Sequence, residues 1–197
     1  MGRFDVEQIS EWQKGYLVGF FVGDGCLNFR SKYYSYITKF ALNASSERAI
    51  ANFLVSILLR AHTKPRVTIK GNRLDIRISS KGLYLFLKMH AGYESEDGKL
   101  RKRLLSNDIW TEEFMLGILA GLIDSDGCVA YDKKKYLRAV ISTRSKVLAS
   151  SMLQLTERLR IKAMIHQSSG FTVRISTPSL KANAPRIRSL KLEQKFK

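Results

Sequence analysis

Two aspartates at the ends of two similar apolar runs carry the chemistry that the sequence suggests. Asp24 closes the run 17–25 and Asp126 closes the run 119–127, each followed by Gly and Cys. If both runs are helices, their terminal carboxylates lie at the negative ends of two helix dipoles and repel each other. A divalent cation with oxygen ligands, Mg²⁺ by default or another such as Mn²⁺, explains that arrangement. Held between two acids and a phosphate, it can activate water for phosphodiester hydrolysis. Taken singly, each Asp-Gly would be only a helix-ending turn.

Small residues recur at every fourth position of both runs. They are Gly15, Gly19 and Gly23 in the first and Gly117, Gly121 and Ser125 in the second. On a helix this spacing makes one smooth stripe. Glycine inside a helix costs roughly 1 kcal/mol relative to alanine, so the stripe needs a reason. We expect the two helices to pack closely together, with Asp24 and Asp126 side by side.

The same order of elements occurs twice along the chain. Each half is predicted to be an αββαββα unit, by its apolar periodicity and turn residues. Three anchors support the duplication. The offset in residue number is 102 from Asp24 to Asp126, 99 from Ser46 to Ser145, and 97 from Arg77 to Arg174. The predicted fold is therefore α+β, with tandem repeats at 1–107 and 108–197 that meet through the motif helices.

The stretch 66–79 predicts a hairpin with one apolar and one polar face, because its apolar and polar residues alternate strictly. A helix at about 81–90 closes the first unit. Residues 92–98 are predicted as a loop, and 99–111 as the lead to the second motif.

A strong positive charge limits the partners. There are 34 Lys and Arg against 17 Asp and Glu, a net charge of +17, so a polyanion is expected. An Arg-rich β-ribbon fits the major groove of double-stranded DNA. The candidate DNA contacts are Arg30, Lys32, Lys39, Arg66, Thr68, Lys70, Arg73, Asp75 and Arg77 in the first half, and Lys134, Arg138, Ser142, Arg144, His166, Thr172 and Arg174 in the second. Thr38 is also expected on this polar face, between the charged residues. The lysine-rich turns at 32 and 133–135 are equally compatible with solvated loops.

Several other classes of protein are disfavoured. The longest apolar run, 114–123, is about half of a membrane span. The N-terminus shows no signal-peptide pattern, and two cysteines without a nearby thiol or histidine make neither a zinc site nor a disulfide framework. We expect an intracellular chain that is not secreted and binds no membrane.

The two apolar runs resemble the motifs of the LAGLIDADG homing endonucleases, in the single-chain form with two motifs. Leu-Ala-Gly-Leu-Ile-Asp-Ser-Asp-Gly at 119–127 departs from the family name only at Ser125, and the looser run 17–25 has Val22 at the sixth position. In this family the penultimate residue of each motif ligates metal, which falls on Asp24 and Asp126. Asp124 is taken as structural.

The resemblance covers nearly the whole chain and implies further site residues. Gly23 and Ser125, which precede the two acids, are additional candidate metal ligands. The family commonly places a basic residue after the last helix of each repeat, to polarise the attacking water or stabilise charge on the phosphate. Lys102 and Lys191 occupy that place best, and in the first repeat three neighbours compete, namely Lys99, Arg101 and Arg103.

The resemblance also implies a function. Saddle-shaped antiparallel sheets would lie over duplex DNA, and a monomeric, Mg²⁺-dependent endonuclease would cut both strands across the minor groove of a long, asymmetric site. Such proteins are typically intron-encoded, and an intein context stays open. Two rivals remain: a maturase that binds intron RNA on the same scaffold, and a DNA-binding regulator that has lost cleavage. The intact Asp24 and Asp126 disfavour the regulator.

Overall fold

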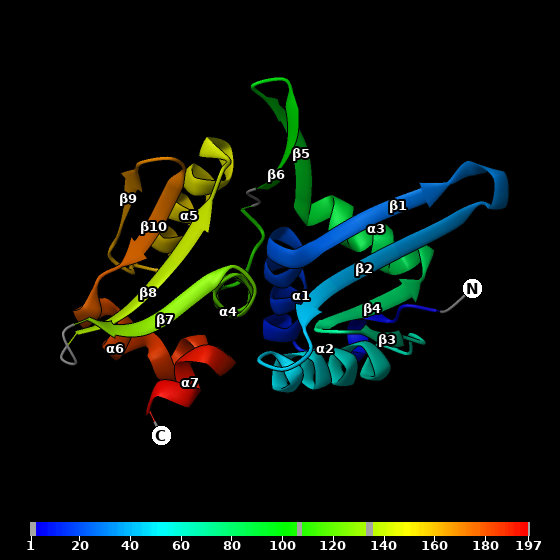
Figure 1. Cartoon of the computed structure of the whole chain (residues 1–197), viewed down its shortest axis with the longest axis horizontal. Helices are drawn as coiled ribbons and strands as arrows, with labels where there is room; N and C mark the ends of the chain where they lie inside the picture. Colours follow the sequence, from blue (N-terminus) through cyan, green and yellow to red (C-terminus); the bar gives the residue numbers. More distant parts are fainter. Residues whose placement is uncertain (1–2, 106–107, 133–135, 197) are drawn as a thin grey trace.

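The computed structural model describes residues 3–105, 108–132 and 136–196, so the candidate contact Lys134 lies outside the described residues. Figure 1 shows two similar halves on either side of a central helix pair. The helices and strands in chain order are α1 (Glu11–Asp24), β1 (Gly25–Arg30), β2 (Ser35–Asn43), α2 (Arg48–Arg60), β3 (Arg66–Lys70), β4 (Arg73–Ser79), α3 (Lys81–His90), β5 (Ala91–Glu96), β6 (Lys99–Leu104), α4 (Glu112–Asp124), β7 (Gly127–Asp132), β8 (Tyr136–Thr143), α5 (Lys146–Arg158), β9 (Ala163–Gln167), β10 (Phe171–Ile175), α6 (Thr177–Ile187) and α7 (Leu190–Phe196).

Each half is built around a four-stranded antiparallel sheet. The strand orders are β1-β2-β4-β3 and β7-β8-β10-β9, so the two sheets share one topology. Helices α2 and α3 pack on the first sheet, and α5 and α6 pack on the second (Figure 1). The predicted α+β fold with tandem αββαββα repeats is confirmed, whereas the boundary between residues 107 and 108 stays a prediction.

Strict alternation decides which face of the first sheet the helices cover. Leu74, Ile76 and Ile78 of β4 are almost fully buried, and the register places Val67 opposite Ile76. The intervening polar residues point to the other face, as the sequence predicts. Thr38 was misplaced by the sequence analysis. It lies opposite Ile78, is fully buried, and its hydroxyl has no hydrogen-bond partner among the described residues.

The hairpin β5–β6 occupies residues 91–104, where the sequence predicts a loop at 92–98 and the first part of the lead at 99–111. Asp97 and Gly98 turn the chain with φ angles of 51° and 70°, which is a conformation that favours Asp-Gly in two-residue hairpins. The strands on either side then pair in register from Glu96–Lys99 to Ala91–Leu104. In the second half the closing helix α6 is followed by α7 instead. The two repeats therefore diverge after their closing helices.

The motif helices α1 and α4 form the centre of the molecule, side by side between the sheets (Figure 1). A capping box starts α1, in which the Ser10 hydroxyl accepts from the Gln13 N–H and the Gln13 side chain accepts from the Ser10 N–H. Thr111 caps α4 through its hydroxyl. Because both helices are enclosed, they are apolar nearly all round. Within the described residues, no helix is long and apolar enough to cross a membrane.

Candidate active site

The stripe of small residues lets α1 and α4 touch through their backbones. A Cβ atom on Gly19 would lie 2.0 Å from the Ile118 carbonyl oxygen, and one on Gly23 would lie 2.0 Å from Ser125 Oγ. No side chain fits in either space, which confirms the packing that the stripe predicts. Since contacts advance along both helices in the same direction, the helices are parallel and end together.

Parallel packing brings the two terminal acids to one place. Asp24 is the last residue of α1 and is half-buried, whereas Asp126 follows the end of α4 and is more exposed. The Asp126 carboxyl lies against Gly23, because a Cβ atom there would be 3.4 Å from its Cγ. The proximity of the two acids, predicted from their repeat-equivalent positions, is thus present in the fold.

The electrostatics of the acids reflect this crowding. The pKa of Asp24 is raised from 3.8 to about 6. Burial is the largest cause and the carboxylates of Asp126 and Glu47 add to it, while Lys102 and Lys191 act in the opposite direction. Partial withdrawal from water also raises the pKa of Asp126, with the two lysines again opposing. Two neighbouring carboxylates that resist ionisation are suited to a bound cation, which would favour their charged forms.

Lys102 lies against the end of α1. Its Nζ donates hydrogen bonds to the carbonyl oxygens of Phe21, Gly23 and Gly25 at 3.0, 2.7 and 2.9 Å. A cation at this position complements the negative end of the helix. Burial lowers the pKa of Lys102, while the two nearby aspartates oppose that effect. The lysine is therefore held between the helix end and the acids.

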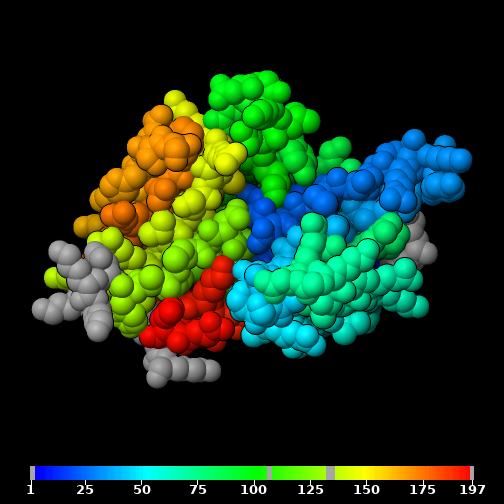
Figure 2. Space-filling view, in the orientation of Figure 1, coloured from blue at the N-terminus to red at the C-terminus, as the bar shows by residue number. Residues whose placement is uncertain are grey.

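Lys191 has the corresponding position at the end of α4. Its Nζ donates to the carbonyl oxygens of Ser125 and Gly127, both at 2.9 Å, and lies 3.6 Å from Glu47 Oε1. In Figure 2, the C-terminal segment that contains α7 (red) lies against the cyan segment around α2, which begins just after Glu47. Both predicted lysines thus flank the acids.

Glu47 is a member of the site that sequence reasoning missed. It lies at the start of α2, and its Oε2 accepts a hydrogen bond from the Asn43 N–H at 2.7 Å. Its carboxylate contributes to the raised pKa values of both Asp24 and Asp126. No local pattern marks Glu47, because its proximity to Lys191 depends on how the two halves come together.

The candidate metal ligands suit a hard, partly hydrated cation. Asp24 and Asp126 offer the carboxylate oxygens that Mg²⁺ prefers. The carbonyls of Gly23 and Ser125 already accept from lysines, and each retains a second lone pair. Within the described residues, no group of three or more His, Cys, Asp and Glu side chains could hold a metal ion. Two carboxylates and two carbonyls leave part of the coordination shell of Mg²⁺ open, and water and phosphate oxygens would complete it.

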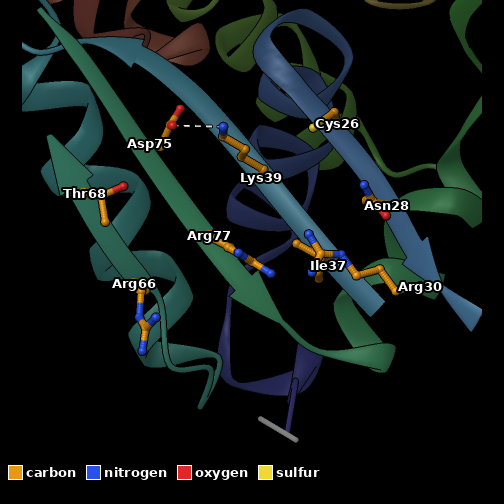
Figure 3. Close-up of a pocket in the computed structure, with 9 residues that line it drawn as sticks. All are labelled: Cys26, Asn28, Arg30, Ile37, Lys39, Arg66, Thr68, Asp75 and Arg77. Atoms are coloured by element: carbon orange, nitrogen blue, oxygen red, sulfur yellow. Dashed lines mark ion pairs between the residues drawn. The ribbon is translucent and has the colours of Figure 1, made fainter. Parts of the chain in front are cut away.

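The polar face of the first sheet forms a groove next to the acids. Figure 3 shows side chains from all four strands on this face, and the lining residues are Cys26, Asn28, Arg30, Ile37, Lys39, Arg66, Thr68, Asp75 and Arg77. Six candidate DNA contacts are among them. Asp75 accepts from Lys39 Nζ and Arg73 Nε, each at 2.9 Å, so this lone acid orients two cations.

Three other candidates of the first half lie at the two ends of its sheet. Lys70 and Arg73 face each other across the β3–β4 turn. Lys32 belongs to a 3₁₀ turn, Ser31–Tyr33, and its Nζ lies 5.6 Å from the centre of the Tyr33 ring. These positions leave both ends of the first sheet positively charged.

The second sheet has a matching groove with fewer charges. It is lined by Arg101, Asp126, Ser142, Thr143, Arg144, Ser168, Ser169, Gly170, Phe171 and Thr172. The register places three further candidates on the same face, since His166 lies opposite Thr172, Arg174 opposite Met164, and Arg138 opposite Ala130. Val140 and Met164 add apolar surface there. The two sheet faces are therefore alike in shape and different in chemistry.

Comparison with known proteins places this architecture in a recognised class. Residues 113–187 match the family model of the LAGLIDADG-like domain. The crystal structure of I-DmoI in complex with DNA and Ca matches with a TM-score of 0.63 and 19% identity, over 92% of this chain and 92% of that one. The homing endonuclease I-WcaI bound to its DNA recognition sequence matches with a TM-score of 0.61 and 14% identity, over 91% and 81%.

These matches confirm the resemblance to single-chain, two-motif LAGLIDADG homing endonucleases, and the chain has their fold. The N-terminal LAGLIDADG domain of DUF199/WhiA has the fold too, with a TM-score of 0.60 and 13% identity over 94% of this chain and 84% of that one. The ATP-dependent DNA helicase Hel308 of Thermococcus kodakarensis is 25% identical over 156 residues, which are 77% of this chain. This chain spans 13% of that relative's length.

Proposed function

We propose that this protein is a site-specific DNA endonuclease that hydrolyses phosphodiester bonds in both strands of a long, asymmetric duplex, using Mg²⁺ or another divalent cation such as Mn²⁺. The observation that carries the proposal is the meeting of Asp24 and Asp126 at the ends of two parallel helices, with a lysine beside each. The acids lie between two sheet faces on a chain of net charge +17. A polyanion bound to both sheet faces would pass over Asp24 and Asp126.

Each group of the site has a distinct role in this proposal. Asp24 and Asp126 would hold the cation, which would act as a Lewis acid and lower the pKa of bound water. Lys102 and Lys191 would stabilise negative charge on the phosphate or polarise the attacking water, since both ammonium groups are already fixed by backbone carbonyls. Glu47 would hold Lys191 on the side turned towards the first repeat.

The different chemistry of the two sheet faces supports an asymmetric target. Guanidinium groups such as those of Arg66 and Arg77 bind phosphates and guanine edges. The second face offers hydroxyls and apolar side chains, including Ser142 and Met164, and an apolar side chain can contact a thymine methyl group. Each half would thus read its own half-site, and one chain would cover the whole site as an intracellular monomer.

A selection from random duplexes tests the proposal. The protein is incubated with a library of random duplex targets and Mg²⁺, and cut molecules are captured and sequenced. We expect a double-strand break in a narrow set of sequences, which EDTA abolishes. Asp24→Asn and Asp126→Asn should each bind the selected duplex and fail to cut it. Asp108→Asn, an exposed control outside the site, should cut normally.

Other outcomes would identify the rivals. Binding to a specific duplex without cutting by the unmodified protein would refute the endonuclease and indicate a regulator on this fold. Cutting that persists in both aspartate variants would remove the acids from the reaction. Selective binding of a structured intron RNA would indicate a maturase. Sedimentation of the complex as one chain per duplex would support the monomer, and two chains per duplex would contradict it.

A further inference from the structure

Asp124, the first of the two acids of the second motif, is fully buried and accepts four hydrogen bonds. Its Oδ2 accepts from the Tyr16 hydroxyl at 2.9 Å and the Leu190 N–H at 3.0 Å. Its Oδ1 accepts from the Ser189 hydroxyl at 2.7 Å and the Lys191 N–H at 2.9 Å. A carboxylate has about four acceptor positions, so this one is satisfied. Burying a charge is costly unless it is bonded in this way, and the bonds join α1, α4 and the start of α7.

These contacts fix both ends of Lys191. Asp124 binds the first backbone N–H groups of α7 and so caps that helix from outside it. The Lys191 side chain then reaches Ser125 and Gly127 with its ammonium group. The backbone of Lys191 is tied to one side of the motif and its Nζ to the other. A change at Asp124 would therefore release the anchor on which the position of the ammonium group depends.

The first repeat holds its lysine by a different device. Val22 takes the place of Asp124 two residues before the terminal acid, and it is almost fully buried in the core. Lys102 lies instead in strand β6, where pairing with Tyr93 of β5 sets its position. The backbone N–H groups of a paired hairpin bond to the neighbouring strand, whereas those in the first turn of α7 need an acceptor from outside the helix. Only the lysine of the second repeat depends on a buried acid.

We propose that Asp124 is a positioning residue that places Lys191 at the acid site, so that losing Asp124 weakens cleavage of one DNA strand and spares the other. The part of the inference that concerns cutting of the two DNA strands rests on the proposed function. The inference assigns to Asp124 a role in the reaction that acts entirely through Lys191. It also makes the two halves of the site inequivalent, because Lys102 is held without such an acid.

The variant Asp124→Val with Tyr16→Phe tests this role. Valine is the residue of the first repeat, and phenylalanine removes the hydroxyl of Tyr16, which is one of the two buried hydroxyls that donate to Asp124. The duplex recovered in the library selection carries a different dye on each strand, and the two cutting rates are measured separately. We expect one strand to be cut about 10- to 100-fold more slowly, the effect typical of lost outer-shell partners, with duplex binding unchanged. Lys191→Met should slow the same strand and Lys102→Met the opposite one.

A second readout does not depend on cleavage. Lysine ammonium groups held by carbonyls exchange protons slowly and give ¹⁵Nζ NMR signals, so Lys102 and Lys191 should both be visible in the native protein. In the double variant the Lys191 signal should disappear and the Lys102 signal should remain. Leu58→Ala, a core change in α2, controls for general destabilisation. It should leave both ammonium signals visible and change the cutting rates of the two strands equally.

The outcomes separate the two claims. Equal slowing of both strands by the double variant, or a Lys191 signal that persists in it, would overturn the positioning role. If the native protein cuts neither strand, the proposed function fails, and the ammonium signals still decide whether Asp124 positions Lys191.

Discussion

Replacing Asp24 with asparagine should stabilise the metal-free protein while abolishing cleavage. Burial and the neighbouring carboxylates raise the pKa of Asp24 from 3.8 to about 6. At neutral pH the folded chain carries this carboxylate in its ionised form, which its surroundings disfavour. At about 1.4 kcal/mol per pH unit, that raised pKa corresponds to at most about 3 kcal/mol, and solvent screening at this partly exposed site reduces the expected cost to about 1–2 kcal/mol. Asparagine has nearly the same shape and no charge, so it should recover most of this free energy.

The sign of the pH dependence follows from proton binding. Between pH 3.8 and about 6 the folded state binds more protons at Asp24 than the unfolded state does. The Asp24 contribution to stability is therefore full below pH 3.8 and is lost as the pH rises through 6. The advantage of Asp24→Asn over the native protein should be near its maximum at pH 7.5 and should shrink towards pH 4.

Urea unfolding in EDTA measures both effects. The free energy of unfolding is compared for the native protein, Asp24→Asn and the exposed control Asp108→Asn at pH 4, 5, 6 and 7.5. Adding Mg²⁺ at pH 7.5 should then stabilise the native protein, since an ion that binds only the folded state does so by mass action. It should not stabilise Asp24→Asn. An asparagine variant that is less stable than native protein at pH 7.5, or a difference that is constant with pH, would refute the electrostatic reasoning.

Three further predictions concern the interface, the DNA surface and the core. Gly19→Ala should cost about 3 kcal/mol or more, because its Cβ atom would meet a backbone oxygen 2.0 Å away; Gly71→Asn, at an open turn, should be nearly neutral in the same urea assay. Arg66→Ala combined with Arg77→Ala should lower the slope of log binding constant against log salt by about 2 on a random-sequence duplex, measured by fluorescence anisotropy; an unchanged slope would show that the first sheet face does not contact DNA. Burial lowers the pKa of His90 from 6.5, with Glu11 opposing, so the contribution of His90 to stability should be lost as the pH falls below 6.5. His90→Gln in the Asp24→Asn background should therefore make the urea midpoint depend less on pH between pH 7 and 5. An unaltered pH dependence would contradict this.

The sequence by itself determined the elements with a strong local pattern. The four-residue spacing of Gly19 and Gly23 predicts a close helix contact. The structure has this contact, since a Cβ atom at either position would lie 2.0 Å from its neighbour. Alternation in 66–79 separated the buried face of β4 from its polar face, since successive side chains of a strand point to opposite sides. The terminal acids Asp24 and Asp126 followed from the duplication. Each of these inferences depends only on residues close together in the chain or on a repeat.

The hairpin β5–β6 was not predicted, although a local sequence pattern marks it. Its turn, Asp97-Gly98, is a recognised local pattern that could have been read from the sequence. With the hairpin in place, the choice among Lys99, Arg101, Lys102 and Arg103 is decided by strand alternation. Lys102 points to the end of α1, and Arg101 lines the groove of the second sheet.

Only the tertiary structure decided which groups surround the acids. Glu47 reaches Lys191 across the interface between the halves, and Asp124 binds Ser189, which lies 65 positions further along the chain. No periodicity relates such residues, because their approach is set by how the helices and sheets pack. The sequence therefore specified the two acids, the motif helices and, through the family resemblance, the two candidate lysines, whereas packing specified the third carboxylate and the bonds of the buried cap.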